Sequence, residues 1–108
     1  MTSADQKNPL IRVLELLKSA DNHARWNEYD EAERLCRDAI DIAKGELGEN
    51  HHAHATALRD LGNILTKQER GFEAREALTK ALEILVKIHG NNDAEVLQLF
   101  AHVHDLYR

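Results

Sequence analysis

Three histidines lie close together in the stretch ENHHAHATALRDLGNIL, residues 49–65, and imidazole nitrogens are common ligands of transition metals. His51 and His54 are three residues apart and could converge at the start of a helix, whereas His52 and His54 are two apart and diverge by about 200°. A metal site needs at least a third ligand, and no Cys, Asp or Glu is locally paired with these histidines. We therefore expect turn and groove histidines, with no metal site and no cofactor.

The remaining reactive residue types give no sign of catalysis. Cys36 is the only cysteine and lies among helix-spaced apolar residues, which indicates buried packing, since a reactive thiol needs a basic and exposed setting. Glu31 and Glu33 fall in the first turn of an expected helix, where carboxylates complement the helix dipole. The sequence contains no motif for phosphate binding, serine hydrolysis, dithiol chemistry or a helical zinc protease. We expect a protein that is not an enzyme and has no catalytic residues.

Composition limits the kinds of partner. The chain has 108 residues, enough for one domain, and its net charge of −5 argues against nucleic acid or an anionic membrane as the main partner. No run approaches the roughly 18 apolar residues of a membrane span, and the start MTSADQKNPL lacks the apolar core of a secretion signal. These features and the single cysteine favour a cytoplasmic protein whose partner is a protein or a peptide.

The chain repeats itself with a period of 42 residues. When residues 30–66 are laid over residues 72–108, six of the 37 pairs are identical, and the apolar positions also coincide. The identical pairs are Glu31/Glu73, Ala32/Ala74, Ala39/Ala81, Ile42/Ile84, Gly48/Gly90 and Asn50/Asn92. A shared apolar face matters more than identity, because that face packs.

The period resolves into an all-α fold of five helices, expected near residues 9–26, 30–47, 52–68, 72–89 and 93–107. Asn8, Asp30 and Asn92 are the expected N-caps, the last two within capping boxes, and Asn27 can adopt the left-handed conformation that ends a helix. Connections of two to six residues predict an antiparallel stack of helix pairs. Residues 1–8 are expected to be a disordered N-terminus, and residues 9–108 the folded domain.

The spacing inside each pair resembles a known repeat. LRDLGNIL, residues 58–65, is followed by Ala74, Leu78 and Ala81, which is similar to the tetratricopeptide repeat (TPR) pattern of small and large residues. The 42-residue length resembles the long repeats of kinesin light chains. The resemblance implies an α-solenoid of about two and a half repeats, with boundaries near 13–54, 55–96 and a half repeat 97–108, that serves as an adaptor or scaffold for protein interactions.

The same resemblance implies a binding groove on the first helix of each pair. Its expected peptide-binding residues are Arg59, Asn63, Thr66, Lys67, Thr56 and Arg25. Arg59, Asn63 and Lys67 follow one another at intervals of four and therefore share a helix face. Arginine and asparagine can hold backbone carbonyls and acidic side chains, so the expected ligand is an extended, acidic peptide.

Excess apolar residues on the two terminal helices indicate an alternative function. The expected interface residues are Leu10, Leu14, Leu17, Phe100, Val103 and Tyr107, which a single neighbouring helix would not cover. Under this alternative the chain is a self-associating structural module, which forms a homodimer or packs on a partner protein.

Overall fold

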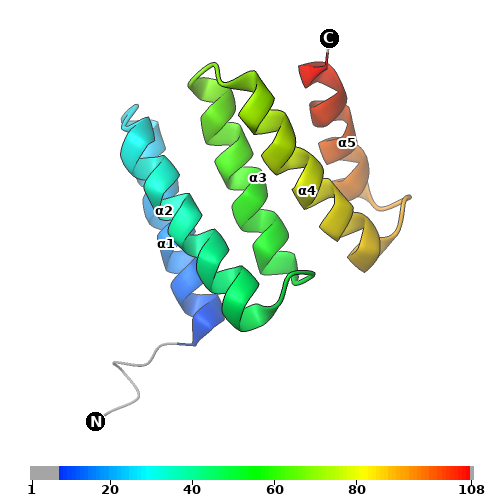
Figure 1. Cartoon of the computed structure of the whole chain (residues 1–108), viewed down its shortest axis with the longest axis horizontal. Coiled ribbons are helices and arrows are strands. Elements are labelled where there is room, and N and C mark those ends of the chain that lie inside the picture. The colour runs from blue at the N-terminus through cyan, green and yellow to red at the C-terminus, as the bar shows by residue number, and fades with distance from the viewer. Residues whose placement is uncertain (1–7, 108) are drawn as a thin grey trace.

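The computed structural model describes residues 8–107, and all regular secondary structure in that range is helical (Figure 1). They are α1 (Pro9–Arg25), α2 (Tyr29–Ile42), the π-helix η2 (Ala43–Leu47), α3 (His52–Lys67), α4 (Gly71–His89) and α5 (Ala94–Leu106). The predicted all-α fold with five α-helices is therefore confirmed. Residues 1–7 of the predicted disordered N-terminus lie outside the described range, and its last residue, Asn8, is the N-cap of α1. Arg108 also lies outside the described range.

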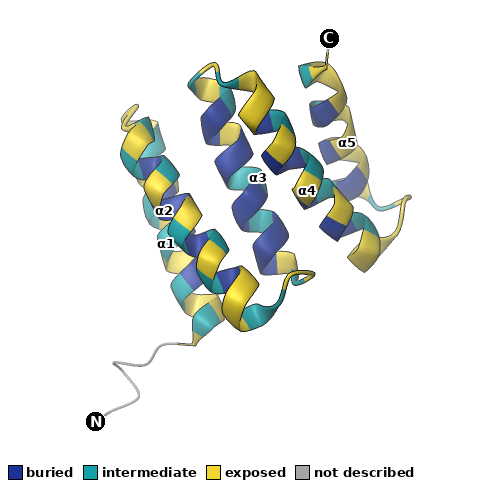
Figure 2. Cartoon of the chain, viewed as in Figure 1, coloured by how far each residue is buried: buried dark blue, intermediate teal, exposed yellow. Residues whose placement is uncertain are grey.

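Consecutive helices pack side by side in an elongated stack that measures 52 × 33 × 19 Å. The helices α1 and α2 form one pair, α3 and α4 form a second, and α5 packs on α4 (Figure 1). Nine residues of the central α3 are buried, while the buried residues of α5 face α4 and its outer side is exposed (Figure 2). The first helices of successive pairs, α1 and α3, therefore meet along one side of the stack.

Side-chain caps and left-handed residues set the helix ends. Asn8 Oδ1 accepts a hydrogen bond from Leu10 N at 2.7 Å, and Asn27 has a φ of 60°, both as predicted. The predicted caps Asp30 and Asn92 are wrong. Helix α2 begins one residue earlier and has no side-chain cap, whereas Asp93 caps α5 because its carboxylate accepts from the free N–H groups of the first turn.

The second helix is not uniformly α-helical. Sequence periodicity predicts one helix over 30–47, but α2 ends at Ile42 and a π-helical turn follows. Gly48 N donates to Ala43 O at 2.9 Å, five residues back, and Gly48 then leaves the helix with a φ of 119°. The wider turn keeps Ala43 buried while the chain changes direction toward α3.

Small residues let the helices approach each other. A Cβ added to Gly62 would lie 2.5 Å from Leu78 Cγ, so α3 and α4 can only reach their observed spacing with glycine at this position. The four alanines that the repeat places on the packing faces, Ala32, Ala39, Ala74 and Ala81, are all 0% exposed. The predicted packing faces of α2 and α4 are therefore confirmed.

Candidate peptide-binding groove between α1 and α3

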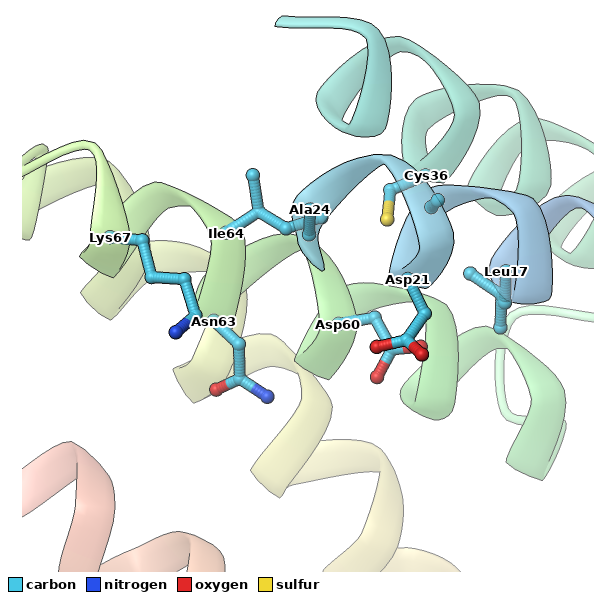
Figure 3. A pocket seen from close by; sticks show the side chains of 9 residues that line it. Leu17, Asp21, Ala24, Cys36, Asp60, Asn63, Ile64 and Lys67 are labelled. Atoms are coloured by element: carbon cyan, nitrogen blue, oxygen red, sulfur yellow. The ribbon is translucent and has the colours of Figure 1, made fainter. Parts of the chain in front are cut away.

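A hollow of about 260 Å³ lies between α1 and α3, and Cys36 of α2 also lines it (Figure 3). Its apolar lining consists of Leu17, Ala20, Ala24, Cys36 and Ile64. Small alanines on α1 leave this space, because a larger side chain at either position would fill it. The hollow has room for one small or medium apolar side chain of a ligand.

Four polar residues surround the apolar lining. Asp21 comes from α1, while Asp60, Asn63 and Lys67 come from α3 at spacings of three and four, so they share one helix face. Figure 3 shows the carboxylates of Asp21 and Asp60 close together, with Asn63 beside them and Lys67 at the end away from Leu17. The groove therefore offers acceptors at one end and a cation at the other.

The carboxylate of Asp60 is partly withdrawn from water. Burial raises the pKa of Asp60 above its usual value; the positive charge of Arg59 opposes this rise and the negative charge of Asp21 adds to it. A hydrogen-bond donor placed against Asp60 would offset both the burial of its carboxylate and the repulsion from Asp21. A second carboxylate at this end of the groove would be repelled.

The six predicted peptide-binding residues separate into two groups. Asn63 and Lys67 border the groove, and within residues 8–107 neither side chain has a hydrogen bond or an ion pair. The other four have partners within the chain and do not line the hollow. Arg59 Nη1 lies 2.7 Å from Glu95 Oε2, Arg25 Nε lies 3.1 Å from Asp21 Oδ2, and the hydroxyls of Thr56 and Thr66 donate to carbonyls of their own helix.

Asp21 and Asp60 line the groove but are not among the six predicted binding residues. The predicted and observed faces share Asn63 and Lys67, and they differ because Asp60 rather than Arg59 borders the groove. The apolar residues Leu61 and Leu65 mark the buried face of α3. Asp60 and Ile64 come directly before them in the chain and lie on the side of α3 that borders the groove, and this spacing is the signal that could have identified Asp60.

Cys36 is a packing residue, as predicted. Its side chain is 0% exposed, and burial raises the pKa of its thiol to about 12. The thiol therefore stays protonated at neutral pH and is a poor nucleophile in the folded chain.

The clustered histidines have separate partners. His51 caps α3, because its Nδ1 accepts from Ala53 N at 2.9 Å, and His54 is buried with its Nδ1 2.7 Å from Glu49 O. The Nδ1 atoms of His51 and His54 are therefore both engaged with backbone groups. His52 instead contacts Glu95 on α5, a residue 43 positions later.

The terminal helices expose some of the predicted interface residues. Leu14 is 53% exposed and Phe100 60% exposed, and Leu10 and Tyr107 are also exposed. Leu17 and Val103 are each only 6% exposed, so the prediction that they are left uncovered is wrong. Leu17 packs into the core that α1 forms with its neighbours, and Val103 lies on the side of α5 that packs against α4. A second hollow of about 560 Å³ lies between α4 and α5, lined by Leu82, Glu83, Val86, Lys87, Asn91, Val96, Leu97 and Phe100.

Paired antiparallel helices, a Gly62 that admits the neighbouring helix and a groove on the first helices define a helical-repeat interaction scaffold. The family model for the tetratricopeptide repeat matches residues 12–85, and the chain belongs to this family, as its sequence pattern predicts. The fold is similar to that of BtubC (BKLC) from P. vanneervenii, with a TM-score of 0.86 and 22% identity. The match covers 94% of this chain and 40% of that one, so the chain spans less than half the length of BtubC.

No curated protein matches the chain. Within the described range, none of the helices has the length and apolar character needed to cross a membrane. The family as a whole consists of scaffolds for protein interactions, which agrees with the expected class of function.

Proposed function

We propose that this chain is a cytoplasmic adaptor or scaffold module that binds an extended peptide segment in the groove between α1 and α3. The observation that supports the proposal is the combination, in one hollow, of an apolar lining with the unpaired side chains of Asn63 and Lys67 within residues 8–107. Side chains of this kind usually form ion pairs or hydrogen bonds to water at a surface, and here they border space that a ligand can occupy.

Each part of the groove suits one part of an extended peptide. The amide of Asn63 can donate to a peptide carbonyl and accept from a peptide N–H, so it can hold the backbone. Lys67 can pair with an acidic side chain. The apolar lining can accept one small side chain, and Asp60 and Asp21 can accept backbone N–H groups at the other end.

The charges of the groove refine the expected acidic preference. Negative charge on the peptide is favoured near Lys67 and disfavoured near the two carboxylates. Arg25 and Arg59 are proposed as flanking contacts, each of which must share its carboxylate partner with the ligand. We therefore expect a peptide with an acidic residue at one end of the bound segment and a neutral or basic residue at the other.

An array of immobilised peptides tests this proposal and does not require an identified partner. Peptides of about eight residues would vary the position of one Asp and one apolar residue, and the fluorescently labelled chain would be applied to them. We expect retention to depend on the spacing between the acidic and apolar residues and to be lost for Lys67→Glu. Equal retention of the parent chain and Lys67→Glu on every peptide would refute the proposed site.

Self-association is the second candidate function, and the exposed apolar surface of α5 supports it. Leu97 is 55% exposed and Phe100 60% exposed, and both border the hollow between α4 and α5. Burial of such side chains contributes about 1.5–3 kcal/mol each, so a second copy of the chain that covers them would gain free energy from their burial. This candidate does not exclude the first, because the hollow between α4 and α5 is separate from the groove.

A further inference from the structure

Three residues that are far apart in the sequence meet where α3 begins, α4 ends and α5 begins. His52 is the first residue of α3, His89 the last of α4, and Glu95 the second of α5. His52 Nε2 lies 3.2 Å and His89 Nε2 lies 3.7 Å from the same oxygen, Glu95 Oε1. The ligand atoms of the three residues all lie within 4.8 Å of one another.

These separations are close to those of a tetrahedral metal centre. Metal–ligand bonds of about 2.0–2.1 Å at tetrahedral angles place neighbouring ligand atoms about 3.3 Å apart. The two distances to Glu95 Oε1 are near this value. Small side-chain rotations would bring the two histidine nitrogens to a similar separation from each other. The rings of His52 and His89 lie edge to face with centroids 5.6 Å apart, so one nitrogen of each ring can face a shared point.

Thr56 lies beside the other nitrogen of His52. The Thr56 hydroxyl donates to His52 O at 3.1 Å, and its oxygen is 3.4 Å from His52 Nδ1, where it could accept a proton from that nitrogen. With its proton on Nδ1, His52 can direct the lone pair of Nε2 toward an ion beside Glu95 Oε1.

Arg59 orients the carboxylate. Its Nη1 lies 2.7 Å from Glu95 Oε2, which leaves Oε1 as the oxygen directed toward the two histidines. Such an outer partner fixes the direction of a metal-binding carboxylate. The side chains of His52, His89 and Glu95 are 46%, 33% and 29% exposed, so an ion can enter from solvent.

We propose that His52, His89 and Glu95 bind one divalent transition-metal ion of the zinc class, with water completing the coordination. Two imidazoles and one carboxylate are a donor set that suits Zn²⁺, and softer or harder ions are disfavoured by the lack of thiolates and by the small number of oxygens. The expectation from sequence of no metal site depended on the absence of a third ligand near His51 and His54. The structure brings two further candidate ligands to His52 from α4 and α5. The bound ion would stabilise the contact of the beginning of α5 with α3 and α4.

Metal titration of the untagged, full chain tests this proposal. After dialysis against a chelator, calorimetry with Zn²⁺ at pH 7 should give one ion per chain with a micromolar Kd, and Co²⁺ should give the strong visible absorption of tetrahedral coordination. His89→Ala and Glu95→Gln should each weaken binding at least about tenfold. His102→Ala removes a histidine of α5 that is outside the cluster, and it should bind as the parent does.

Circular dichroism spectra and melting temperatures of the metal-free variants distinguish a loss of metal binding from a loss of folding. Residues His89 and Glu95 are partly exposed, so their variants should retain the helical spectrum of the parent. Folded variants that lose the Co²⁺ spectrum while His102→Ala keeps it would support the site. Binding of Zn²⁺ that is equally strong in His89→Ala and Glu95→Gln, or the absence of Zn²⁺ binding in the parent, would overturn it.

Discussion

Gly62 and Leu78 are in such close contact that a side chain at position 62 would displace Leu78. A Cβ on Gly62 would lie 2.5 Å from Leu78 Cγ and 2.6 Å from Leu78 Cδ2, and Leu78 is 0% exposed, so it would have to shift against the surrounding core. We expect Gly62→Ala to destabilise the chain by about 1–3 kcal/mol although alanine favours helices, because the added methyl overpacks the α3–α4 contact. Urea unfolding followed by circular dichroism measures the change.

Gly45→Ala is the matched control for this substitution. A Cβ at Gly45 meets nothing within 4 Å and the backbone is not left-handed there, so this variant should be as stable as the parent or slightly more stable. If Gly62→Ala were as stable as Gly45→Ala, the close helix contact would not limit the size of the residue at position 62.

Glu33 gives the fold a dependence on pH. Its carboxylate lies 2.7 Å from Arg70 Nη1 and 2.8 Å from Arg37 Nη2; burial opposes ionisation, but hydrogen bonds and charge from both arginines hold the pKa of Glu33 below its ordinary value of 4.5. Because the pKa of Glu33 is lower in the folded state, its ionised carboxylate contributes fully to the free energy of unfolding above pH 4.5. This contribution is lost as the pH falls through the pKa of Glu33 in the folded state. We expect Glu33→Gln to lower Tm at pH 7 by several degrees, and we expect the difference in Tm between the two proteins to shrink as the pH falls below 4.5.

Thermal melts of both proteins at half-unit steps of pH provide the test. Glu76→Gln is the control, because Glu76 is exposed and makes no ion pair within residues 8–107. A difference between Glu33→Gln and the parent that stays constant from pH 7 to pH 3 would show that the ionised carboxylate does not carry the contribution.

Cys36 should react only when the chain unfolds. Its side chain is 0% exposed and its thiol has a pKa raised to about 12 by burial, so both access and ionisation are suppressed. A colorimetric disulfide reagent at neutral pH should modify native protein at least about a hundredfold more slowly than protein in strong denaturant. Rapid modification of native protein would place the thiol at an accessible surface.

Light scattering decides whether the apolar surfaces of the terminal helices form a homodimer. We expect a species heavier than the 12.3 kDa monomer at tens of micromolar, and we expect Phe100→Asp or Leu14→Asp to restore the monomer. Trp26→Asp is the control, since Trp26 is 77% exposed in the α1–α2 turn and outside the proposed surface. A 12.3 kDa species at every concentration, unchanged by Phe100→Asp, would exclude this contact.

Sequence periodicity predicts the fold well because the repeat appears twice in the apolar pattern. The positions of α1 to α5 and the buried alanines follow from spacing alone. Spacing alone does not predict the details of the helix ends. Asp93 rather than Asn92 caps α5, and α2 gives way to a π-helical turn at Ala43, where the chain turns toward α3.

The candidate site was only partly predictable. Asn63 and Lys67 lie in the groove, but Arg59 pairs with a residue of another helix, Glu95, which no local pattern relates to it. The rotation of α3 about its own axis, which brings Asp60 into the groove, follows from its packing against α1, α2 and α4. Contacts between helices far apart in the sequence are therefore what the sequence alone leaves undetermined.

The groove proposal is tested most directly by the affinity of one peptide for the parent chain and for two variants. The peptide would be the one that the array retains best, labelled for fluorescence anisotropy, and the variants would be Asn63→Ala/Lys67→Ala and Lys80→Ala. Lys80 is an exposed lysine on α4 and is not part of the groove, so its variant controls for the loss of one positive charge.

We expect a micromolar Kd for the parent, the same value for Lys80→Ala, and binding at least about tenfold weaker for the double variant, because two charge-assisted or neutral hydrogen bonds are removed. Binding should also weaken as salt is raised, since Lys67 is exposed. An unchanged Kd in a folded Asn63→Ala/Lys67→Ala chain would contradict the proposal that the groove between α1 and α3 binds the peptide.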